Sequence, residues 1–229
     1  MSDRRSPQPS SHASVRPRPP RVIGITGGIG MGKTTISNYL STVHHLPVLD
    51  ADVYARQAVE RNSPVFTEIV ERYGSTILLP DGQLDRVRLG DIVFHNSAER
   101  LWLEQRIHPF VRDRISSELQ SLAERQVPTA VTVVPLLFEA RMTDLTTEIW
   151  VVHCTRNQQV ERVIQRDASP GTNGKLKPEQ VYARIDSQMP IEAKLERADI
   201  ILDNSGTLET LFQQIDQALQ SNPHASHRH

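Results

Sequence analysis

The sequence predicts an α/β fold: a five-stranded parallel sheet flanked by helices, plus a helical substrate-binding insert and a lid. Two observations predict the sheet. Five short apolar segments separated by helical patterns are typical of parallel strands covered on both faces; they are residues 22–26, 47–49, 130–134, 149–153 and 200–202. The first segment runs directly into a glycine-rich loop, G-x-x-x-x-G-K-T, at residues 27–34. The length of 229 residues suits one such domain with a small insertion.

Composition narrows the class of protein. The 26 Lys and Arg residues nearly balance 27 Asp and Glu, so the overall charge indicates neither a nucleic-acid partner nor a membrane surface. No apolar run approaches the ~20 residues that span a bilayer. The single cysteine, Cys154, excludes an internal disulfide and a cysteine-rich zinc site. Because Cys154 ends an apolar stretch, we expect a buried, unreactive thiol.

Both termini are expected to be disordered. Residues 1–20 form a basic tail rich in Ser, Pro and Arg, without apolar periodicity or a secretory segment, which favours a cytoplasmic protein. An organelle transit peptide is the alternative, although the prolines argue against its usual amphipathic helix. Residues 221–229 contain three histidines, for which a frayed end fits better than a metal-binding tail.

The glycine loop predicts binding of nucleotide phosphates. Its glycines allow backbone amides to point into one concavity, and the following helix, with Ile36, Leu40 and Val43 at helical spacing, adds a positive end. In this pattern Lys33 reaches the β- and γ-phosphates and the Thr34 hydroxyl joins a Mg²⁺ shell. A glycine turn that only packs a helix is the alternative; a dinucleotide fingerprint would require glycine at position 33.

Two carboxylates, Asp50 and Asp52, follow the second strand. In a parallel sheet they lie at the carboxyl edge, where the glycine loop also lies. Phosphoryl transfer to a hydroxyl requires a carboxylate to orient the hydroxyl or accept its proton. Asp50 or Asp52 suits this role, and an N-cap of the next helix is the alternative for Asp52.

The gap between the second and third strands is too long for one crossover and predicts an insert of mostly helices. Its helical patterns are residues 52–61, residues 64–73, one from Asn96 with Glu99 placed for a capping box, and one from Pro109 with an apolar stripe at Val111, Ile115, Leu119 and Leu122. Residues 79–82 predict a turn. Ligands of open α/β sheets bind at the carboxyl ends of the strands, so this insert is placed to hold a second substrate.

A later segment indicates a lid. Residues 169–177 join a helix holding Arg162 and Arg166 to one that begins near Pro178 and holds Arg184. Two arginine-bearing helices around a glycine-containing loop suit a lid over phosphates, and an exposed helical hairpin with solvated charges remains the alternative. The third strand ends without an aspartate, which disfavours a motor-type ATPase and favours small kinases.

With these motifs in order, the chain resembles the dephospho-CoA kinase family from residue 22 to about 219. The matching segments are residues 24–34, 49–52, 55–56, 81–82, 85–86, Leu89, 93–94, 103–104, 108–109, 135–139, Arg162, 166–167, 184–185, Gln188 and 198–206. The ordered combination of Asp-Ala-Asp, His-Pro and Asp-Asn-Ser-Gly is far more specific than the glycine loop alone.

The resemblance implies transfer of the ATP γ-phosphate to the 3′-hydroxyl of the dephospho-CoA ribose, with Mg²⁺. It implies a P-loop kinase core at 21–60 and 128–220, a lid at about 156–190 and a helical substrate (CoA) domain at 61–127. The implied catalytic residues are Asp52, the base, with Lys33 and Arg166. The implied ATP ligands are Gly28, Ile29, Gly30, Met31, Gly32, Lys33, Thr34, Thr35 and Asn204, with Thr34 on Mg²⁺, and the implied acceptor ligands are Asp50, Asp52, His108 and Leu136.

Some features depart from the family, and alternatives stay open. Met31 and Thr34 stand where Ser is usual, residues 169–177 are longer than expected, and the basic tail is additional. His108 and Pro109 also fit a helix junction that shapes the insert. A kinase for another small hydroxyl compound and a non-catalytic nucleotide switch are the competing functions, but the guanine-reading Asn-Lys-x-Asp of switches does not occur. We expect a monomer or weak homo-oligomer without nucleic-acid or membrane partners.

Overall fold

The structure is a computed structural model that describes residues 20–167 and 178–221. Three predicted segments therefore lie outside the described residues, apart from one boundary residue at each tail. They are the basic tail at 1–20, the loop at 169–177 and the C-terminal tail at 221–229 with its histidines.

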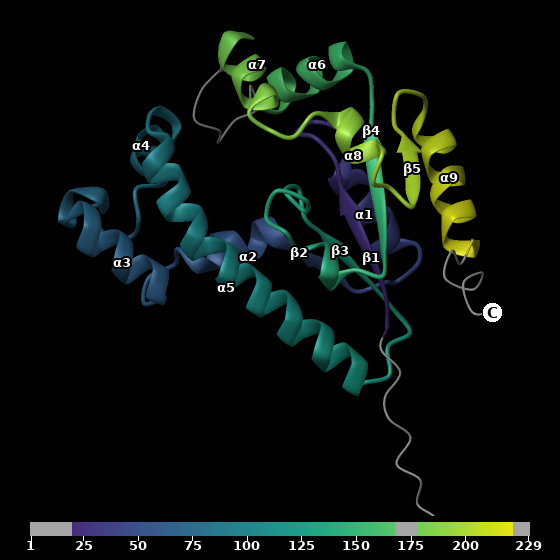
Figure 1. The fold of residues 1–229 in the computed structure, drawn as a ribbon, viewed down its shortest axis with the longest axis horizontal. Coiled ribbons are helices and arrows are strands. Elements are labelled where there is room, and N and C mark those ends of the chain that lie inside the picture. The colour runs from purple at the N-terminus through teal and green to yellow at the C-terminus, as the bar shows by residue number, and fades with distance from the viewer. Residues whose placement is uncertain (1–19, 168–177, 222–229) are drawn as a thin grey trace, which may run out of the picture.

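The five predicted strands form one sheet with every neighbouring pair parallel. They are β1 (Arg21–Thr26), β2 (Val48–Asp50), β3 (Thr129–Val133), β4 (Glu148–His153) and β5 (Ile200–Asp203), in the spatial order β2-β3-β1-β4-β5. The predicted α/β fold with a five-stranded parallel sheet is confirmed (Figure 1). Because β1 is central, the glycine loop that follows it lies between the carboxyl ends of β3 and β4.

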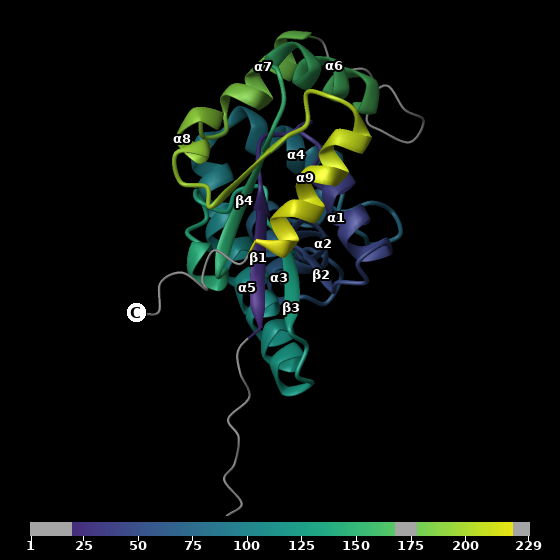
Figure 2. The same cartoon turned by 90° about the vertical axis from the view of Figure 1, so that its right-hand side faces the viewer.

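Helices cover both faces of this sheet, and alternating residues of β3 show how. Val131 and Val133 pack in a buried cluster with α1 (Lys33–Thr42) and α9 (Leu208–Gln220), which lie next to each other in Figure 2. Ala130, which points to the other face, packs in a second cluster with α5 (Ser97–Glu124). The strand period of two thus divides one segment between two cores.

The predicted insert is helical and has its own small core. It contains α2 (Ala51–Ala58), α3 (Pro64–Tyr73), a 3₁₀ turn (Ser75–Ile77), α4 (Arg86–His95) and the first part of α5. Its core residues are Ala58, Val59, Val65, Ile69, Ile77, Leu84 and Leu89. In Figure 1 α3 and α4 extend away from the sheet. The helix α4 was not predicted; the Asp85 side chain caps it by accepting from the Arg88 amide.

One helix boundary was wrong. We expected a helix to begin at Pro109, but α5 runs unbroken for 28 residues from Ser97 to Glu124 with Pro109 inside it. Proline removes one helical hydrogen bond, which normally favours a break. The helix continues because both of its halves are held by packing: Ile107 and Phe110 contact the insert core, while Val111 and Ile115 are buried against the sheet.

The turn at residues 79–82 is confirmed by the Gly82 amide, which donates to the Leu79 carbonyl at 2.9 Å. The capping box at Asn96 is only half formed. The Asn96 side chain accepts from the Ala98 and Glu99 amides, but the Glu99 carboxylate binds the Arg72 guanidinium at 2.7 Å instead of returning to the cap. A charged partner from α3 outcompetes the local amide because charge-assisted hydrogen bonds are stronger.

Two further helices, α6 (Arg156–Asp167) and α7 (Pro178–Asp186), flank the glycine loop at the top of Figure 1. They share a small core formed by Val163, Val181 and Ile185, against which Ile29 of the glycine loop packs. The short α8 (Ile191–Leu195) then leads into β5. These helices therefore lie at the same sheet edge as the predicted phosphate site.

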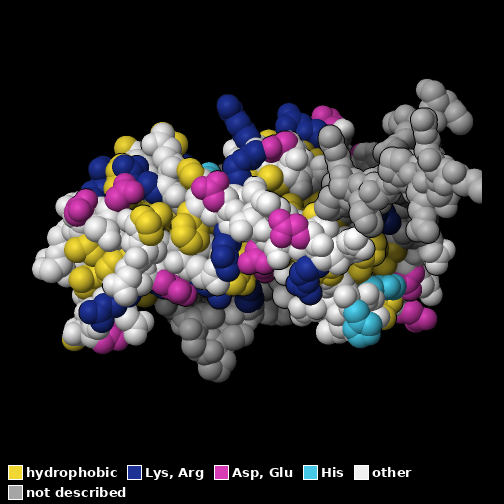
Figure 3. Space-filling view, turned by 90° about the horizontal axis from the view of Figure 1, so that it is seen from below, with side chains coloured by type: hydrophobic (Ala, Val, Ile, Leu, Met, Phe, Trp, Pro, Cys, Tyr) yellow, Lys and Arg dark blue, Asp and Glu magenta, His cyan; other side chains and the backbone are white. Residues whose placement is uncertain are grey.

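The surface mixes charges of both signs. Figure 3 shows Lys and Arg interspersed with Asp and Glu on one face, with apolar side chains gathered over the insert. Exposed apolar residues of the insert include Val87, Phe94 and Leu101. Within the described ranges, no helix has the length and apolar content to cross a bilayer.

Candidate active site

The P-loop, residues 27–34, has the backbone that its glycines predict. Gly27, Gly30 and Gly32 have φ angles of 147°, 74° and 102°, which side chains other than glycine rarely allow. A Cβ on Gly32 would lie 2.1 Å from Asn204 Nδ2, and one on Gly27 would lie 2.4 Å from the Val152 carbonyl oxygen. Gly32 then begins α1, so the amide end of that helix faces the loop's concavity.

Lys33 turns back over this loop. Its ammonium donates to the Gly27 and Gly28 carbonyls, both at 2.9 Å. Burial lowers the pKa of Lys33 to about 8, and Asp52 partly opposes this by favouring the charged form. The lysine is therefore held at the mouth of the loop with a proton that it loses more readily than an exposed lysine does.

Asp50 and Asp52 have different surroundings. The Asp50 side chain accepts from the Asp52 amide at 2.8 Å and is the N-cap of α2, so the alternative in which Asp52 is the cap is wrong. The cap is the residue just before the first helical turn, and α2 begins at Ala51, directly after β2 ends at Asp50. Asp52 lies in the first turn of the helix, in the wall of a cavity. Loss of surrounding water raises its pKa, as does the Asp50 carboxylate, while Lys33 lowers it.

A polar cavity of about 420 Å³ gathers most of the predicted phosphate-binding groups. Predicted residues that line it are Ile29, Gly30, Gly32, Lys33, Thr34, Asp52, Leu136 and Arg166; Pro135, Arg162 and Gln188 complete it. It therefore brings together the P-loop, the carboxylate after β2, the exit of β3 and two arginines of α6. A cavity with several cations and one carboxylate suits a polyphosphate and a group that carries a proton.

An apolar cavity of about 280 Å³ lies against the first one. It is formed by α2, α4, α5 and the exit of β3, and its lining includes the predicted residues His108 and Leu136. Asp52, Pro135 and Leu136 line both cavities. Asp52 therefore lies where the polar cavity meets the apolar cavity.

Five predicted residues lie outside these two cavities. Gly28 and Met31 face a third cavity on the other side of the P-loop, where the Met31 sulfur accepts from the Gly28 amide at 3.1 Å. The Thr35 amide donates to the Gly32 carbonyl at 3.0 Å within the first turn of α1. Asp50 is occupied as the helix cap. The fifth, Asn204, has the most constrained surroundings.

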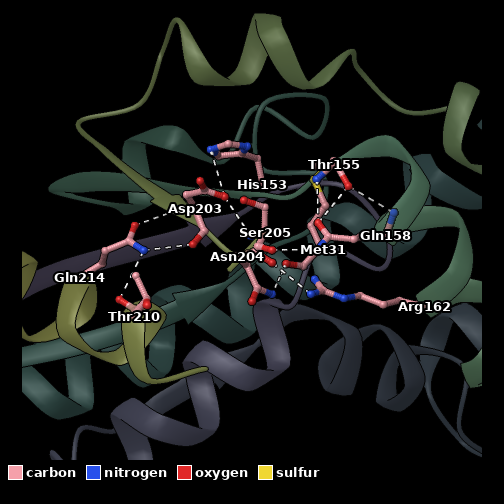
Figure 4. Close-up of polar contacts among 10 residues, drawn as sticks. All are labelled: Met31, His153, Thr155, Gln158, Arg162, Asp203, Asn204, Ser205, Thr210 and Gln214. Carbon is pink, nitrogen blue, oxygen red and sulfur yellow. Dashed lines mark hydrogen bonds and ion pairs between the residues drawn. The ribbon is translucent and has the colours of Figure 1, made fainter. Parts of the chain in front are cut away.

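Asn204 supports the P-loop from behind. Asn204 is only 4% exposed. Its side-chain Nδ2 donates to the Met31 backbone carbonyl at 2.9 Å, and its backbone carbonyl accepts from the Arg162 guanidinium at 3.0 Å. In Figure 4 dashed lines join Asn204 to Met31 and to Arg162. The structure therefore brings Asn204 to the P-loop backbone, and Arg162 links α6 to the same point.

The arginines predicted for the lid separate into two groups. Arg162 and Arg166 line the polar cavity, as their spacing on one face of a helix suggests. Arg184 is exposed on α7 and lines none of the cavities described above. The α6 arginines are thus placed to meet phosphate in this conformation, while Arg184 lies away from it.

Three residues that support the site, Gln159, Gln188 and Lys194, had no role predicted from the sequence. The Gln188 side chain accepts from the Ile29 amide at 2.9 Å, and the Gln159 side chain donates to the Ile29 carbonyl at 2.9 Å. Lys194 is fully buried near the exit of β3. Neither the lysine, which shares its short helix with Glu192, nor the glutamines stand in a short-range pattern that predicts these contacts.

Comparisons with known proteins agree with this geometry. The family described as dephospho-CoA kinase matches residues 21–210. A dephospho-CoA kinase of Trichormus variabilis is 52% identical over 199 residues, covering 87% of this chain and 96% of the relative. A crystal structure from Thermus thermophilus is 32% identical with a TM-score of 0.72, covering 90% of this chain and all, 100%, of the other.

A dephospho-CoA kinase structure from Campylobacter jejuni is 27% identical with a TM-score of 0.63 and covers 87% of this chain and 95% of the other. The family match and the relative extend over the sheet, the insert and the P-loop together. The five-stranded core, its cavities and these matches lead to one conclusion: the chain belongs to the dephospho-CoA kinase family.

Proposed function

We propose that this chain transfers the γ-phosphate of ATP to the 3′-hydroxyl of dephospho-CoA, forming coenzyme A and ADP. One observation carries the proposal: Asp52 lies at the junction of the polar cavity and the apolar cavity. A transfer enzyme must hold a phosphate donor and an acceptor on opposite sides of one proton-accepting group. The family of the chain supplies the identity of the two substrates.

The donor side uses the P-loop. Backbone amides of residues 28–35 and the amino end of α1 would hold the ATP phosphates, and Lys33 would contact the β- and γ-phosphates. Arg166, which lines the same cavity, would offset the charge that develops on the transferred group. Asn204 would act here by holding the Met31 carbonyl, and so the shape of the loop.

Asp52 would accept the proton of the 3′-hydroxyl. The hydroxyl oxygen would then bond to the γ-phosphorus of ATP, while the bond from that phosphorus to the β–γ bridging oxygen breaks and ADP leaves. The raised pKa of Asp52 suits this task, because a base gains efficiency as its pKa approaches the working pH. Lys33 lines the same cavity as Asp52, and its positive charge opposes the rise in the pKa of Asp52 by favouring the ionised carboxylate.

The residues present fit a Mg²⁺ ion. Thr34 is exposed and lines the polar cavity together with Asp52, and Mg²⁺ typically takes one or two protein oxygens besides water and substrate phosphates. Thr34 would therefore hold it. When bound, the ion would neutralise charge on the β- and γ-phosphates.

On the acceptor side, the apolar cavity between α2, α4 and α5 suits the less polar part of dephospho-CoA, with His108 and Leu136 in its wall. Asp50 would contribute by capping α2 and thereby orienting Asp52. We assign residues 61–127 to the substrate domain, 21–60 and 128–220 to the core, and about 156–190 to a lid that closes over ATP. The enzyme would work in the cytoplasm as a monomer or weak homo-oligomer, since one chain lines both cavities.

The test is ADP release from ATP and Mg²⁺ with and without dephospho-CoA, with the product mass checked for one added phosphate. Asp52→Asn should keep ATP affinity and lower kcat by about 10²- to 10⁴-fold. Asp91→Asn, at an exposed aspartate of α4 outside both cavities, is the control. ATP binding without acceptor-dependent release would refute the assigned acceptor, and full turnover by Asp52→Asn would remove its role as base.

A further inference from the structure

Lys194 is charged yet completely buried. Its side chain is 0% exposed, although removing an ammonium from water costs several kcal/mol unless partners replace the water. Two partners do so: the Glu139 carboxylate at 2.9 Å and the Pro135 carbonyl at 3.0 Å. The lysine comes from α8, and both partners come from the exit of β3.

These partners belong to the walls of the candidate active site. Pro135 lines both cavities, and its carbonyl also accepts from the Thr26 hydroxyl at 3.2 Å. The Glu139 oxygen that binds Lys194 also accepts from the Met189 amide at 3.1 Å. One residue earlier, Gln188 accepts from the Ile29 amide of the P-loop.

The ion pair therefore joins three segments that the site needs in fixed relation. They are the P-loop, the exit of β3 that separates the two cavities, and residues 188–189, where the α6–α7 pair returns to the core. The strand exit and the α7–α8 junction are 50 residues apart at Glu139 and Met189. No local structure would hold them together.

We propose that Lys194 and Glu139 are positioning residues for the phosphoryl transfer. Their ion pair holds the Pro135 wall and the 188–189 segment against the P-loop, so that both cavities keep their shape before substrates bind. This inference rests on the proposed function, because the reaction it refers to is the phosphoryl transfer. ATP affinity can be measured without that reaction and tests the positioning role independently. Misplacement of reacting groups by about 1 Å can cost about 10²-fold in rate.

Stability alone does not require this pair. Replacing a buried ion pair with uncharged residues of similar volume is often neutral or stabilising. The lysine also acts on the site through its charge: the pKa of Lys33 is lowered chiefly by burial, but Lys194 and Arg166 lower it further, while Asp52 and Asp50 raise it. Removal of the Lys194 charge should therefore raise the pKa of Lys33.

The test compares Lys194→Met with the double variant Lys194→Met/Glu139→Gln. The single variant leaves a carboxylate without its buried partner and should lose stability. The double variant removes both charges and should regain it, while the introduced glutamine can still accept from the Met189 amide. In both, kcat should fall about 10²-fold, ATP should bind more weakly by calorimetry, and the alkaline limb of kcat/KM should move to higher pH.

A double variant with wild-type kcat, ATP affinity and pH profile would overturn the proposal and leave a structural ion pair. If the single variant does not fold, the double variant still decides. If the wild-type chain binds ATP but does not phosphorylate dephospho-CoA, the proposed function fails, and the ATP affinities of the variants still test the positioning role. Arg21→Met is the matched control, because it breaks another buried pair of this fold far from the cavities.

Discussion

The two ends of the same sheet each carry an ion pair with a fully buried member, and the pairs differ in what surrounds them. At the amino end, Arg21 binds Glu148, whose side chain is 0% exposed, at 2.7 Å. At the carboxyl end, Lys194, also 0% exposed, binds Glu139 at 2.9 Å. The amino-end pair is surrounded by backbone of β1, β4 and α9; the carboxyl-end pair adjoins two cavities.

The difference shows that one type of interaction has different consequences at the two edges of a parallel sheet. Arg21 also donates to the Leu219 carbonyl at 2.8 Å and to Ser221 at 3.0 Å, and so binds the end of α9. Loss of the Arg21 side chain should therefore lower the free energy of unfolding and leave ligand binding unchanged. At the carboxyl edge, where the strand ends form the site, a change should affect ligand binding as well.

The largest effect should come from Gly32→Ala, at the carboxyl edge. A φ of 102° and a Cβ that would lie 2.1 Å from Asn204 Nδ2 leave no room for the methyl group, so the P-loop must shift. We expect ATP affinity to fall by at least about 10²-fold, by analogy with the loss of one preorganised group, measured by calorimetry.

Gly90→Ala is the matched control for that substitution. Gly90 lies in α4, with nothing within 4 Å of a Cβ added there. Alanine should stabilise the helix by about 0.5–1 kcal/mol and leave ATP binding unchanged. Equal ATP affinity in Gly32→Ala and Gly90→Ala would show that the conformation of the P-loop does not govern binding.

Arg21→Met should have the next largest effect, now at the amino edge. Removing one partner of a buried pair should lower the free energy of unfolding by about 3 kcal/mol, measured by urea denaturation. We expect kcat and KM of the folded variant to match the wild-type values, because Arg21 lines none of the cavities described. A selective change in kcat would remove the contrast between the two edges.

A smaller effect concerns pH at the carboxyl edge. The folded pKa of Lys33 is about 8 against an ordinary 10.5, so the lysine loses its charge as pH rises above about 8. The kcat/KM for ATP, which reports the free enzyme, should fall along that limb. Lys33→Arg should abolish the limb, whatever its rate, because arginine stays protonated. A wild-type kcat/KM that stays constant well above the lowered pKa of Lys33 would contradict the prediction that this lysine must be charged to bind ATP.

The same lowered pKa acts on stability with the opposite sign. Between about 8 and 10.5 the unfolded chain holds the Lys33 proton more tightly than the folded chain does. Unfolding therefore takes up protons in this window, and the Lys33 contribution to stability rises with pH. Binding and stability should respond in opposite directions, which separates this lysine from groups elsewhere in the fold.

The smallest effect should come from an exposed pair in the insert. The Arg72 guanidinium and the Tyr73 hydroxyl hold the pKa of Glu99 at about 2, below its ordinary 4.5. The contribution of this pair to folding stability is fully present above about pH 4.5 and is lost as the pH falls toward about 2. Glu99→Gln should therefore flatten the acid side of the stability curve, measured by urea denaturation on either side of the ordinary pKa.

Glu118→Gln, which removes an exposed i,i+4 pair with Arg114, is the control for Glu99→Gln and should change little. An equal response of the two variants would mean that the contacts of Glu99 to α3 add nothing beyond surface charge. Because solvent screens the Glu99 pair, its effect should remain well below that of Arg21→Met.

Short-range patterns determined much of this protein. Short apolar segments separated by helical patterns predicted all five strands, and the glycines at 27, 30 and 32 predicted a loop whose backbone only glycine adopts easily. The helix from Pro64 to Tyr73 begins and ends where its proline and the following Gly74 indicate. Each of these features depends on neighbours within a few residues, so the sequence itself states them.

Tertiary structure decided the features that depend on distant partners. Packing on two cores carries α5 through Pro109, and Arg72 takes Glu99 from its cap. Asp50, rather than Asp52, caps α2, because the end of β2 sets where the helix begins. The contacts of Gln188 with Ile29 and of Lys194 with Pro135 span 159 and 59 residues. Burial gives such contacts their value, and burial is a property of the folded chain that no local pattern records.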